Sequence, residues 1–296
     1  MSPKPYKDTD FIAFVSLLND LAADFDGQAT DEAAQLEYES FIGRDLTKQR
    51  VVIRHPEDPS QLIAYADFFV PHDSAEANLA LGVRAHVRGR EPSLYDWLAS
   101  QVKSLNVNTL NMYAPGKARG LRAFLETQGF EEAGAYRMLV LEPFNKPESS
   151  ALPDGYTLTT YANTPDDALF ISASDLSFSD LWGHTPATKE AWEMLLEFYE
   201  PENLYLLLYE GSPAGIFKLR VSDNEGFIDS PGLAPGHRSA DLYRALTLAG
   251  LDHLAPHTIE RVWLETWGEP EETVNVYKGL GFKVDTLEIG YKHTLD

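Results

Sequence analysis

Charged residues in the second half of the chain lie in a pattern suited to both proton transfer and anion binding. Glu225, Phe227 and Asp229 occupy every second position of an apolar run that is typical of a strand. Their side chains, including both carboxylates, therefore lie on one face of that strand. A carboxylate can take a proton from an amine before the nitrogen reacts. Arg238 follows in a turn before a helical segment, where unpaired backbone N–H groups and the helix dipole favour an anion.

The spacing of apolar residues predicts the elements that hold these groups. Residues 227–282 read as strand, turn, helix, strand, helix and strand in close succession. The first helix of this stretch is indicated by Leu242, Ala245, Leu246 and Ala249, which recur at helical spacing. Across the strand–helix junction the chain has the pattern Leu-x-Pro-x-x-Arg-x-x-x-Leu.

This junction resembles the signature of the GNAT superfamily of N-acetyltransferases: arginine or glutamine, two residues, glycine, one residue, then glycine or alanine. Arg238 fills the first position, while Asp241 and Tyr243 replace the two small residues. A carboxylate at position 241 would repel a pyrophosphate and could cap the helix instead. The resemblance implies acetyl-CoA as co-substrate, held in this half by Leu233, Arg238, Ser239, Ala240, Asp241, Leu242 and Tyr243.

The segment from Tyr277 to Phe282 is similar to the Tyr-x-x-Leu-Gly-Phe ending of the same family. The resemblance implies that Tyr277 is the general acid that protonates the departing CoA thiolate, although Leu-Gly-Phe is by itself a helix C-cap. Some family members place a glutamate base thirteen residues before the motif arginine, which selects Glu225 first and Asp229 second. For each carboxylate the alternative is a solvated group at a strand edge.

Two longer segments resemble the mycothiol synthase-like branch of the family, in which this base position lies nearer Phe227. They are residues 177–192, SFSDLWGHTPATKEAW, and residues 246–254, LTLAGLDHL. The first contains an acidic-x-Trp-Gly turn from Asp180 to Gly183, which could also be only a tight turn with a buried tryptophan.

The two halves of the chain repeat one another. Arg88 and Arg238 are 150 residues apart, and the Gly-Phe pairs at 129–130 and 281–282 are 152 apart. We therefore predict an α/β (α+β) fold of two tandem GNAT-like domains, each a mostly antiparallel sheet flanked by helices. The expected boundaries are 1–145 for the first domain, 146–155 for a Pro/Ser-rich linker and 156–296 for the second domain.

The first half keeps the charge of a phosphate turn but lacks the acid. Its equivalent acetyl-CoA contacts would be Val83, Arg88, Gly89 and Arg90, with Glu91 in place of the next glycine. Leu125 stands four residues before Gly129, where the second half has its tyrosine, and a leucine donates no proton. We therefore expect the first domain to be structural and the second to be the catalytic candidate.

Composition narrows the range of partners. The 296-residue chain has 24 Lys and Arg against 46 Asp and Glu, a net charge of −22, which disfavours nucleic acid and anionic membranes. It has no cysteine, hence no disulfide or thiolate nucleophile, and its histidines lack metal-ligand spacing. No stretch is apolar enough to span a bilayer, so a cytoplasmic protein without a metal is expected.

The sequence thus predicts transfer of an acetyl group from acetyl-CoA to a small amine by direct attack, without an acyl-enzyme. One alternative is a catalytically inactive GNAT-like protein that binds CoA or a small ligand. Asp241, Tyr243 and Pro270 favour that alternative, because relatives have small residues at the first two positions and usually asparagine at the third. A second alternative is a structural or dimerising module. The acceptor and the oligomeric state stay open.

Overall fold

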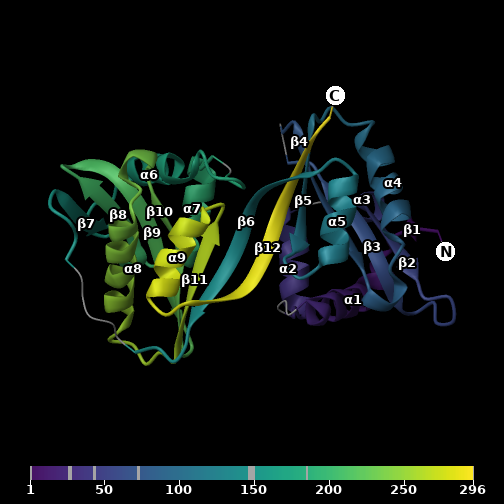
Figure 1. Ribbon diagram of the computed structural model, residues 1–296, viewed down its shortest axis with the longest axis horizontal. Helices are drawn as coiled ribbons and strands as arrows, with labels where there is room; N and C mark the ends of the chain where they lie inside the picture. Colours follow the sequence, from purple (N-terminus) through teal and green to yellow (C-terminus); the bar gives the residue numbers. More distant parts are fainter. Residues whose placement is uncertain are drawn as a thin grey trace. The chain divides into compact units, whose positions relative to one another are not determined.

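The computed structural model describes residues 2–25, 29–42, 45–71, 74–145, 151–184 and 186–295. The chain divides into two compact units, Met1–Ala133 with Glu288–Asp296, and Gly134–Leu287. Each unit is a mostly antiparallel sheet with helices packed against it (Figure 1), as the sequence predicted. Among the described residues, no helix has the length and apolar character needed to cross a membrane.

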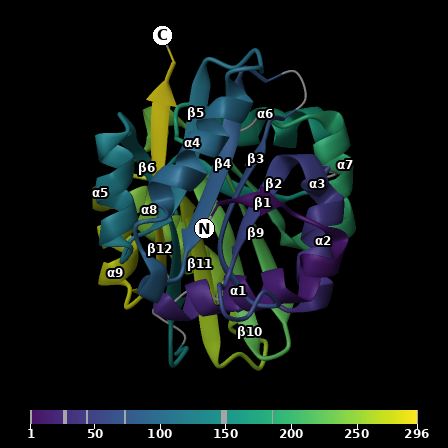
Figure 2. The same ribbon diagram turned by 90° about the vertical axis from the view of Figure 1, so that its right-hand side faces the viewer.

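The first unit contains the strands in the order β1-β2-β3-β4-β5-β12. Figure 2 shows α4 and α5 on one side of this unit and α2 on the other. The opening strand of this half, which the sequence did not reveal, is only the two residues of β1. The strands are β1 (Lys4–Pro5), β2 (Arg50–Arg54), β3 (Leu62–Phe69), β4 (Glu76–Val83), β5 (Thr109–Pro115) and β12 (Lys283–Thr294); the helices are α1 (Phe11–Asp24), α2 (Glu32–Ile42), α3 (Leu46–Gln49), α4 (Glu91–Val102) and α5 (Arg119–Thr127).

The second unit repeats this order of elements, with its strands arranged β6-β11-β10-β9-β8-β7. One face of the sheet packs with α8 and α9 in a large apolar cluster, and the other face packs with α6 and α7. The strands are β6 (Glu131–Leu141), β7 (Tyr156–Thr160), β8 (Leu204–Tyr209), β9 (Ser212–Ser222), β10 (Glu225–Leu233) and β11 (Arg261–Trp267); the helices are α6 (Asp167–Phe178), α7 (Lys189–Phe198), α8 (Ala240–Leu254) and α9 (Glu271–Gly279).

The two parallel strands of the second unit separate part of the way along. β10 and β11 pair from Glu225 opposite Arg261 to Ile228 opposite Leu264. Beyond these residues both strands continue, but they no longer pair with each other. A register shift between Asp229 and Gly232 bends β10 away, and Ser230 within it has a left-handed φ of 44°. The first unit has the same opening, because the pairing of β4 with β5 ends at Leu79 opposite Met112.

The last strand of each half lies in the sheet of the other unit. β6 pairs antiparallel with β11, and β12 pairs antiparallel with β5. The sequence-based boundaries of 1–145 and 156–296 therefore differ from the compact units, which exchange their final strands. Apolar alternation predicts that a segment is a strand, but it does not say which neighbour the strand joins. Of the expected linker, residues 146–150 lie outside the described chain.

The exchange of strands makes a prediction about local stability. Leu139 of β6 is fully buried in the apolar cluster of the second unit, and Ile289 of β12 is buried beside β5. Each truncation to alanine should cost about 2–5 kcal/mol through lost burial and a cavity. We expect Leu139→Ala to reduce hydrogen-exchange protection in β11 more than in β5, and Ile289→Ala to do the reverse. The opposite pattern would contradict the exchange.

Candidate functional site

The opening between β10 and β11 carries polar side chains on both faces of the sheet. Phe227 and Asp229 alternate along β10 and, together with Glu265 and Trp267 of β11, lie on the face covered by α6 and α7. On the opposite face, Thr266 follows Leu264 toward α8 and α9. A ligand lying in the opening would therefore meet both sets of groups.

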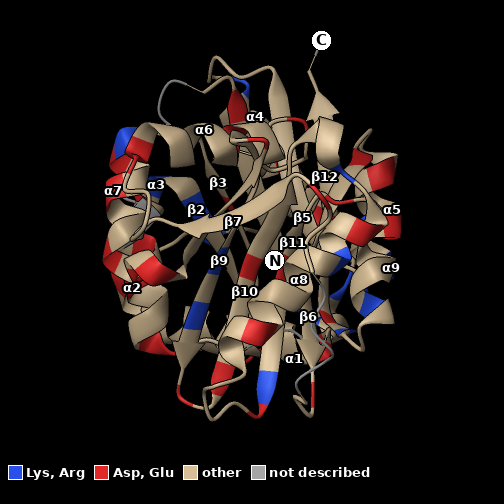
Figure 3. Cartoon of the chain, turned by 90° about the vertical axis from the view of Figure 1, so that its left-hand side faces the viewer, with Lys and Arg blue, Asp and Glu red and all other residues tan. Residues whose placement is uncertain are grey.

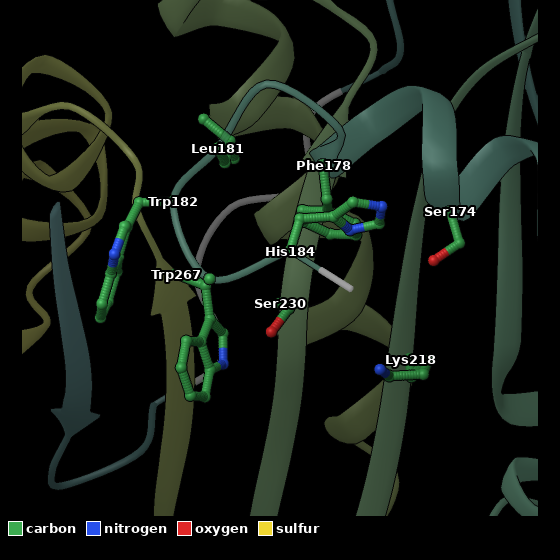
Figure 4. Close-up of a pocket in the computed structure, with 9 residues that line it drawn as sticks. Ser174, Phe178, Leu181, Trp182, His184, Lys218, Ser230 and Trp267 are labelled. Atoms are coloured by element: carbon green, nitrogen blue, oxygen red, sulfur yellow. The ribbon is translucent and has the colours of Figure 1, made fainter. Parts of the chain in front are cut away.

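A cavity of about 230 Å³ lies beside this opening, between α6, the turn after it and strands β9 to β11 (Figure 4). Its walls are aromatic, with Phe178, Trp182 and Trp267. Its polar groups are the hydroxyls of Ser174 and Ser230, the imidazole of His184 and the ammonium of Lys218. A smaller hollow shares several of these residues and includes Asp229 in its lining.

Two carboxylates lie on the cavity side of the opening. Asp229 is 8% exposed, and the Tyr199 hydroxyl donates a 2.5 Å hydrogen bond to its Oδ2. Glu265 accepts a hydrogen bond from the indole of Trp267. Burial, assisted by the nearby charge of Asp229, raises the pKa of Glu265 above its usual value. Glu265 is thus poised to take up a proton closer to neutral pH than an exposed glutamate would.

Glu265 was not among the site residues predicted from the sequence. The sequence does contain an indication of this residue. Glu265 shares one face of its strand with Trp263 and Trp267, and the other face of that strand is apolar. An acidic residue between two tryptophans on one face of a buried strand indicates a polar pocket rather than a solvated edge.

On the opposite face, Tyr277 is buried completely, with an exposed fraction of 0%. Within the described chain its hydroxyl has no hydrogen-bond partner, and neither has the hydroxyl of Thr266. The rings of Tyr243 and Tyr277 meet edge to face with centroids 6.3 Å apart. Burial raises the pKa of Tyr277 well above that of a free phenol, so its hydroxyl carries a proton at neutral pH. Buried hydroxyls without partners are rare, which suggests that a ligand supplies one.

A further buried acid, Glu269, lies next to these tyrosines. It is 3% exposed, and its two carboxylate oxygens have no hydrogen-bond partner among the described residues. Burial raises its pKa to about 8, against the smaller opposing effects of nearby backbone N–H groups and of Arg137. The sequence could not show this, because an acid just before Pro270 at a helix start looks like an ordinary solvated first-turn residue.

The predicted phosphate cradle at the start of α8 is only partly available to a ligand. Ser239 caps the helix by accepting from the Leu242 N–H, while Ala240 and Asp241 are exposed in the first turn. Arg238 points elsewhere: its guanidinium donates to Asp180 at 2.6 and 2.8 Å, to the Ser177 carbonyl and to the Leu233 carbonyl. Leu242 and Tyr243 are buried in the core. The arginine of the motif therefore fixes the turn after α6.

That turn brings Trp182 into the cavity wall. A Cβ on Gly268, which has a φ of 71°, would lie 2.8 Å from the backbone nitrogen of Trp182. A Cβ on Gly134 would lie 2.7 Å from the Cβ of Trp182. Both positions accept only glycine without displacement, so the Asp180–Gly183 turn is a close-packed part of the site.

Glu225, the first candidate base, lies away from the cavity. It begins β10, where β10 and β11 are still paired, and accepts a 3.1 Å hydrogen bond from the Trp263 indole. Its other oxygen is 3.4 Å from Nε of Arg261. Asp229 is four residues further along the strand, roughly 13 Å at about 3.3 Å per residue. Asp229, but not Glu225, lines the smaller hollow beside the cavity.

The equivalent site of the first unit is filled by its own side chains. The Glu91 carboxylate accepts from the Gly89 N–H at 2.6 Å, so an internal anion takes a group that a phosphate would use. Arg88 is exposed at the turn, Arg90 precedes α4, and Val83 is buried at the end of β4. Leu125 is fully buried where the second unit has Tyr277.

The described residues hold no group of three or more side chains that could ligate a metal. No family model matches the chain. The GCN5-related N-acetyltransferase from Sphaerobacter thermophilus superposes with a TM-score of 0.75 at 18% identity, covering 99% of this chain and 95% of that one. A tandem GNAT protein from the clavulanic acid biosynthesis pathway superposes with a TM-score of 0.63 at 16% identity, covering 99% and 97%.

These likenesses, together with the order of elements in each unit, show a tandem GNAT fold. In sequence, the chain is similar to the mycothiol acetyltransferase of Rhodococcus erythropolis, at 25% identity over 95% of each chain. It is also similar to that of Nocardia farcinica, at 26% identity over 79% of this chain and 80% of the relative. The chain thus has the GNAT fold and is similar in sequence to mycothiol acetyltransferases, and these relatives support an acyltransferase.

The buried acid beside Tyr277 predicts how stability depends on pH. Because the folded pKa of Glu269 is about 8, the folded state binds the extra proton between the ordinary glutamate pKa and that value. Its contribution is therefore complete below the ordinary glutamate pKa and is lost as the pH rises through 8, on the order of 5 kcal/mol in all and about 3 kcal/mol between pH 5.5 and 8.5. We expect urea unfolding at pH 5.5, 7 and 8.5 to show this loss in the parent and not in Glu269→Gln. Glu272→Gln, at an exposed position of the same helix turn, is the control and should retain the parent's slope.

Proposed function

We propose that the second unit transfers an acetyl group from acetyl-CoA to a small amine. The observation that carries this proposal is the opening between β10 and β11, with buried Asp229 and half-buried Glu265 on one side and, on the other, the Tyr277 hydroxyl, which has no partner in the described chain. The names of the relatives support the same chemistry. Cavity size favours a small acceptor, because about 230 Å³ is below the ~300–1,000 Å³ of pockets for drug-sized ligands.

The thioester end of acetyl-CoA fits the residues that are present. Thr266, on the end of β11 that no longer pairs with β10, and Tyr277, on α9 over the same face of the sheet, offer two buried hydroxyls without partners in the described chain. The diphosphate end fits less well, because Asp241 puts a carboxylate in the first turn of α8 and Arg238 is engaged by Asp180. Binding would then depend on the first-turn backbone N–H groups and on the apolar part of the opening.

Proton removal is assigned to the two carboxylates on the cavity side of the opening, Asp229 and Glu265. Asp229 or Glu265 accepts a proton from the acceptor ammonium, which frees the nitrogen lone pair for attack on the thioester carbonyl. Glu265 has the raised pKa that suits a base working near neutrality, and Asp229 is already bound by the Tyr199 hydroxyl. The nitrogen–carbon bond then forms directly, since the chain has no cysteine nucleophile.

Tyr277 completes the reaction from the other face. As the carbon–sulfur bond breaks, its hydroxyl donates a proton to the leaving sulfur. The neighbouring Glu269 is largely uncharged at pH 7 because its pKa is about 8, so it adds little negative charge that would hold the phenol's proton back.

A second candidate function is binding without catalysis. The engagement of Arg238 by Asp180 and the carboxylate of Asp241 favour it, since both weaken a diphosphate site. A purely structural module is a third candidate, but it leaves the buried hydroxyls of Thr266 and Tyr277 unexplained.

Removing one hydroxyl separates these functions. Tyr277→Phe keeps the ring that packs against Tyr243, so folding should survive, while acetyl transfer should fall about 10²–10⁴-fold through loss of the general acid. Release of free CoA thiol with a panel of small amines measures the rate. Tyr205→Phe removes another buried phenol of the same unit, which bonds to His253, and should leave turnover near the parent's. A parent that acetylates no amine would establish the binding-only function instead.

The assignment of the base has its own test. The deprotonated fraction of Glu265 grows as the pH rises through its raised pKa, so kcat/KM should rise with pH over that range. We expect Glu265→Gln or Asp229→Asn to lower kcat/KM about 10²–10⁴-fold and to flatten this limb, with the larger effect at the true base. Glu225→Gln should change kcat/KM little, because Glu225 lies roughly four strand positions from the cavity. A large effect of Glu225→Gln alone would restore Glu225 as the base.

A further inference from the structure

The cavity beside the opening contains a cation that the proposed chemistry does not use. Lys218 is half-buried on β9 and lines both the main cavity and the smaller hollow next to it. Figure 4 shows its ammonium directed toward Ser230 and Trp267, into the cavity. The Nζ atom of Lys218 lies over the aromatic ring of Tyr199, 5.6 Å from the ring centroid.

The absence of an ion pair at Lys218 is unexpected, because an acid stands directly opposite. Asp229 is the cross-strand partner of Lys218 in the β9–β10 ladder. The Asp229 carboxylate nevertheless accepts from the Tyr199 hydroxyl, and in the part of the chain that the structure describes Lys218 forms no salt bridge. In a protein with 46 acidic side chains and 24 basic ones, a lysine inside a cavity thus has no direct carboxylate partner in the described chain, although its charge acts on Glu265 at longer range.

The charges of this face lie in a row across three strands. Lys218 of β9 is level with Asp229 of β10, and Glu265 follows the last β10–β11 pair, Ile228 opposite Leu264. Neighbouring strands are ~4.8 Å apart, so the backbones of Lys218 and Asp229 are separated by about one strand spacing. Figure 3 shows the acidic residues spread over the outer helices of this unit, while β9 carries basic residues.

We propose that the acceptor is an amino-acid-type zwitterion, whose carboxylate is held by Lys218 while its amine faces Asp229 and Glu265. This inference rests on the proposed acetyl transfer, and it adds the class of acceptor. A charge-assisted contact between an ammonium and a carboxylate is among the stronger hydrogen bonds available to a ligand. The row of charges places the amine at the side of the cavity where β10 and β11 open, toward the thioester.

The charge of the whole protein agrees with a zwitterion rather than a simple anion. A net charge of −22 repels an acceptor that is negative overall, but it does not repel one whose ammonium and carboxylate balance. The walls formed by Trp182 and Trp267 suit an apolar or aromatic side chain on that acceptor. His184 is paired with Asp175 at 3.2 Å, so Lys218 is the cation of the cavity that is left to bind the carboxylate.

The test compares two acceptors of the same size and side chain, L-phenylalanine and L-phenylalaninamide, of which only the first carries a carboxylate. The amide's amine loses its proton more readily, so a preference for the acid can come only from recognition of the carboxylate. We expect the parent's kcat/KM to favour the acid about 10–100-fold, and Lys218→Met to abolish that preference by reducing the rate with the acid alone. Lys218→Arg should keep part of it, and Lys189→Met, at an exposed lysine of α7, should match the parent.

Ligand binding without turnover is measured in parallel, as the shift in melting temperature on adding each compound. A preference for the amide, or an acid preference that survives in Lys218→Met, overturns the inference while leaving acetyl transfer intact. A parent that acetylates neither compound but is stabilised by phenylalanine, with the shift lost in Lys218→Met, supports the zwitterion site and overturns the catalytic proposal. A parent that neither binds nor acetylates phenylalanine or the other L-amino acids overturns the inference.

Discussion

The separation of β10 from β11 is the constraint on which the site depends. Parallel strands normally remain paired along their length, because each unpaired backbone group buried away from water costs free energy. Here the register shift between Asp229 and Gly232, with Ser230 in a left-handed conformation, ends the pairing after Ile228. The strands cannot close again without removing this bulge. A persistent opening through the centre of the sheet is therefore built into the backbone.

The polar groups around the opening follow from that geometry. On one face Asp229 and Glu265 are desolvated, and on the other Thr266, Glu269 and Tyr277 have buried polar atoms without partners in the described chain. Each such atom costs about 1–3 kcal/mol relative to a satisfied one. A fold selected only for stability would fill these positions with apolar side chains, as the first unit does with Leu125. Their retention in one unit favours a site that a ligand completes.

Much of the fold could be predicted from the sequence, and less of the site. Apolar periodicity predicted the order of strands and helices in residues 227–282, and the 150-residue spacing of Arg88 and Arg238 indicated two units of one kind. The exchange of β6 and β12 could not be predicted, because period-two alternation carries no information about the partner strand. The motif arginine was found, but its engagement by Asp180 depends on a turn 58 residues away. Glu269 could not be predicted as a buried acid, because its position before Pro270 is typical of a solvated helix start. Its raised pKa follows from burial, which the sequence does not show.

The exchange of strands gives the first half of the chain a direct part in the second unit's site. Arg137, on β6, donates from Nη1 to the Glu269 carbonyl at 3.4 Å and pairs with Glu271 at 3.3 Å, so it lies beside the strand end that carries the buried acid. Tyr136 packs on Trp267 with ring centroids 4.5 Å apart, against the wall of the cavity. The other edge of β11 would be an unpaired edge without β6. A first half that has lost its own acid and filled its own phosphate turn is thus still required, because its last strand completes the sheet that holds Glu265 and Trp267.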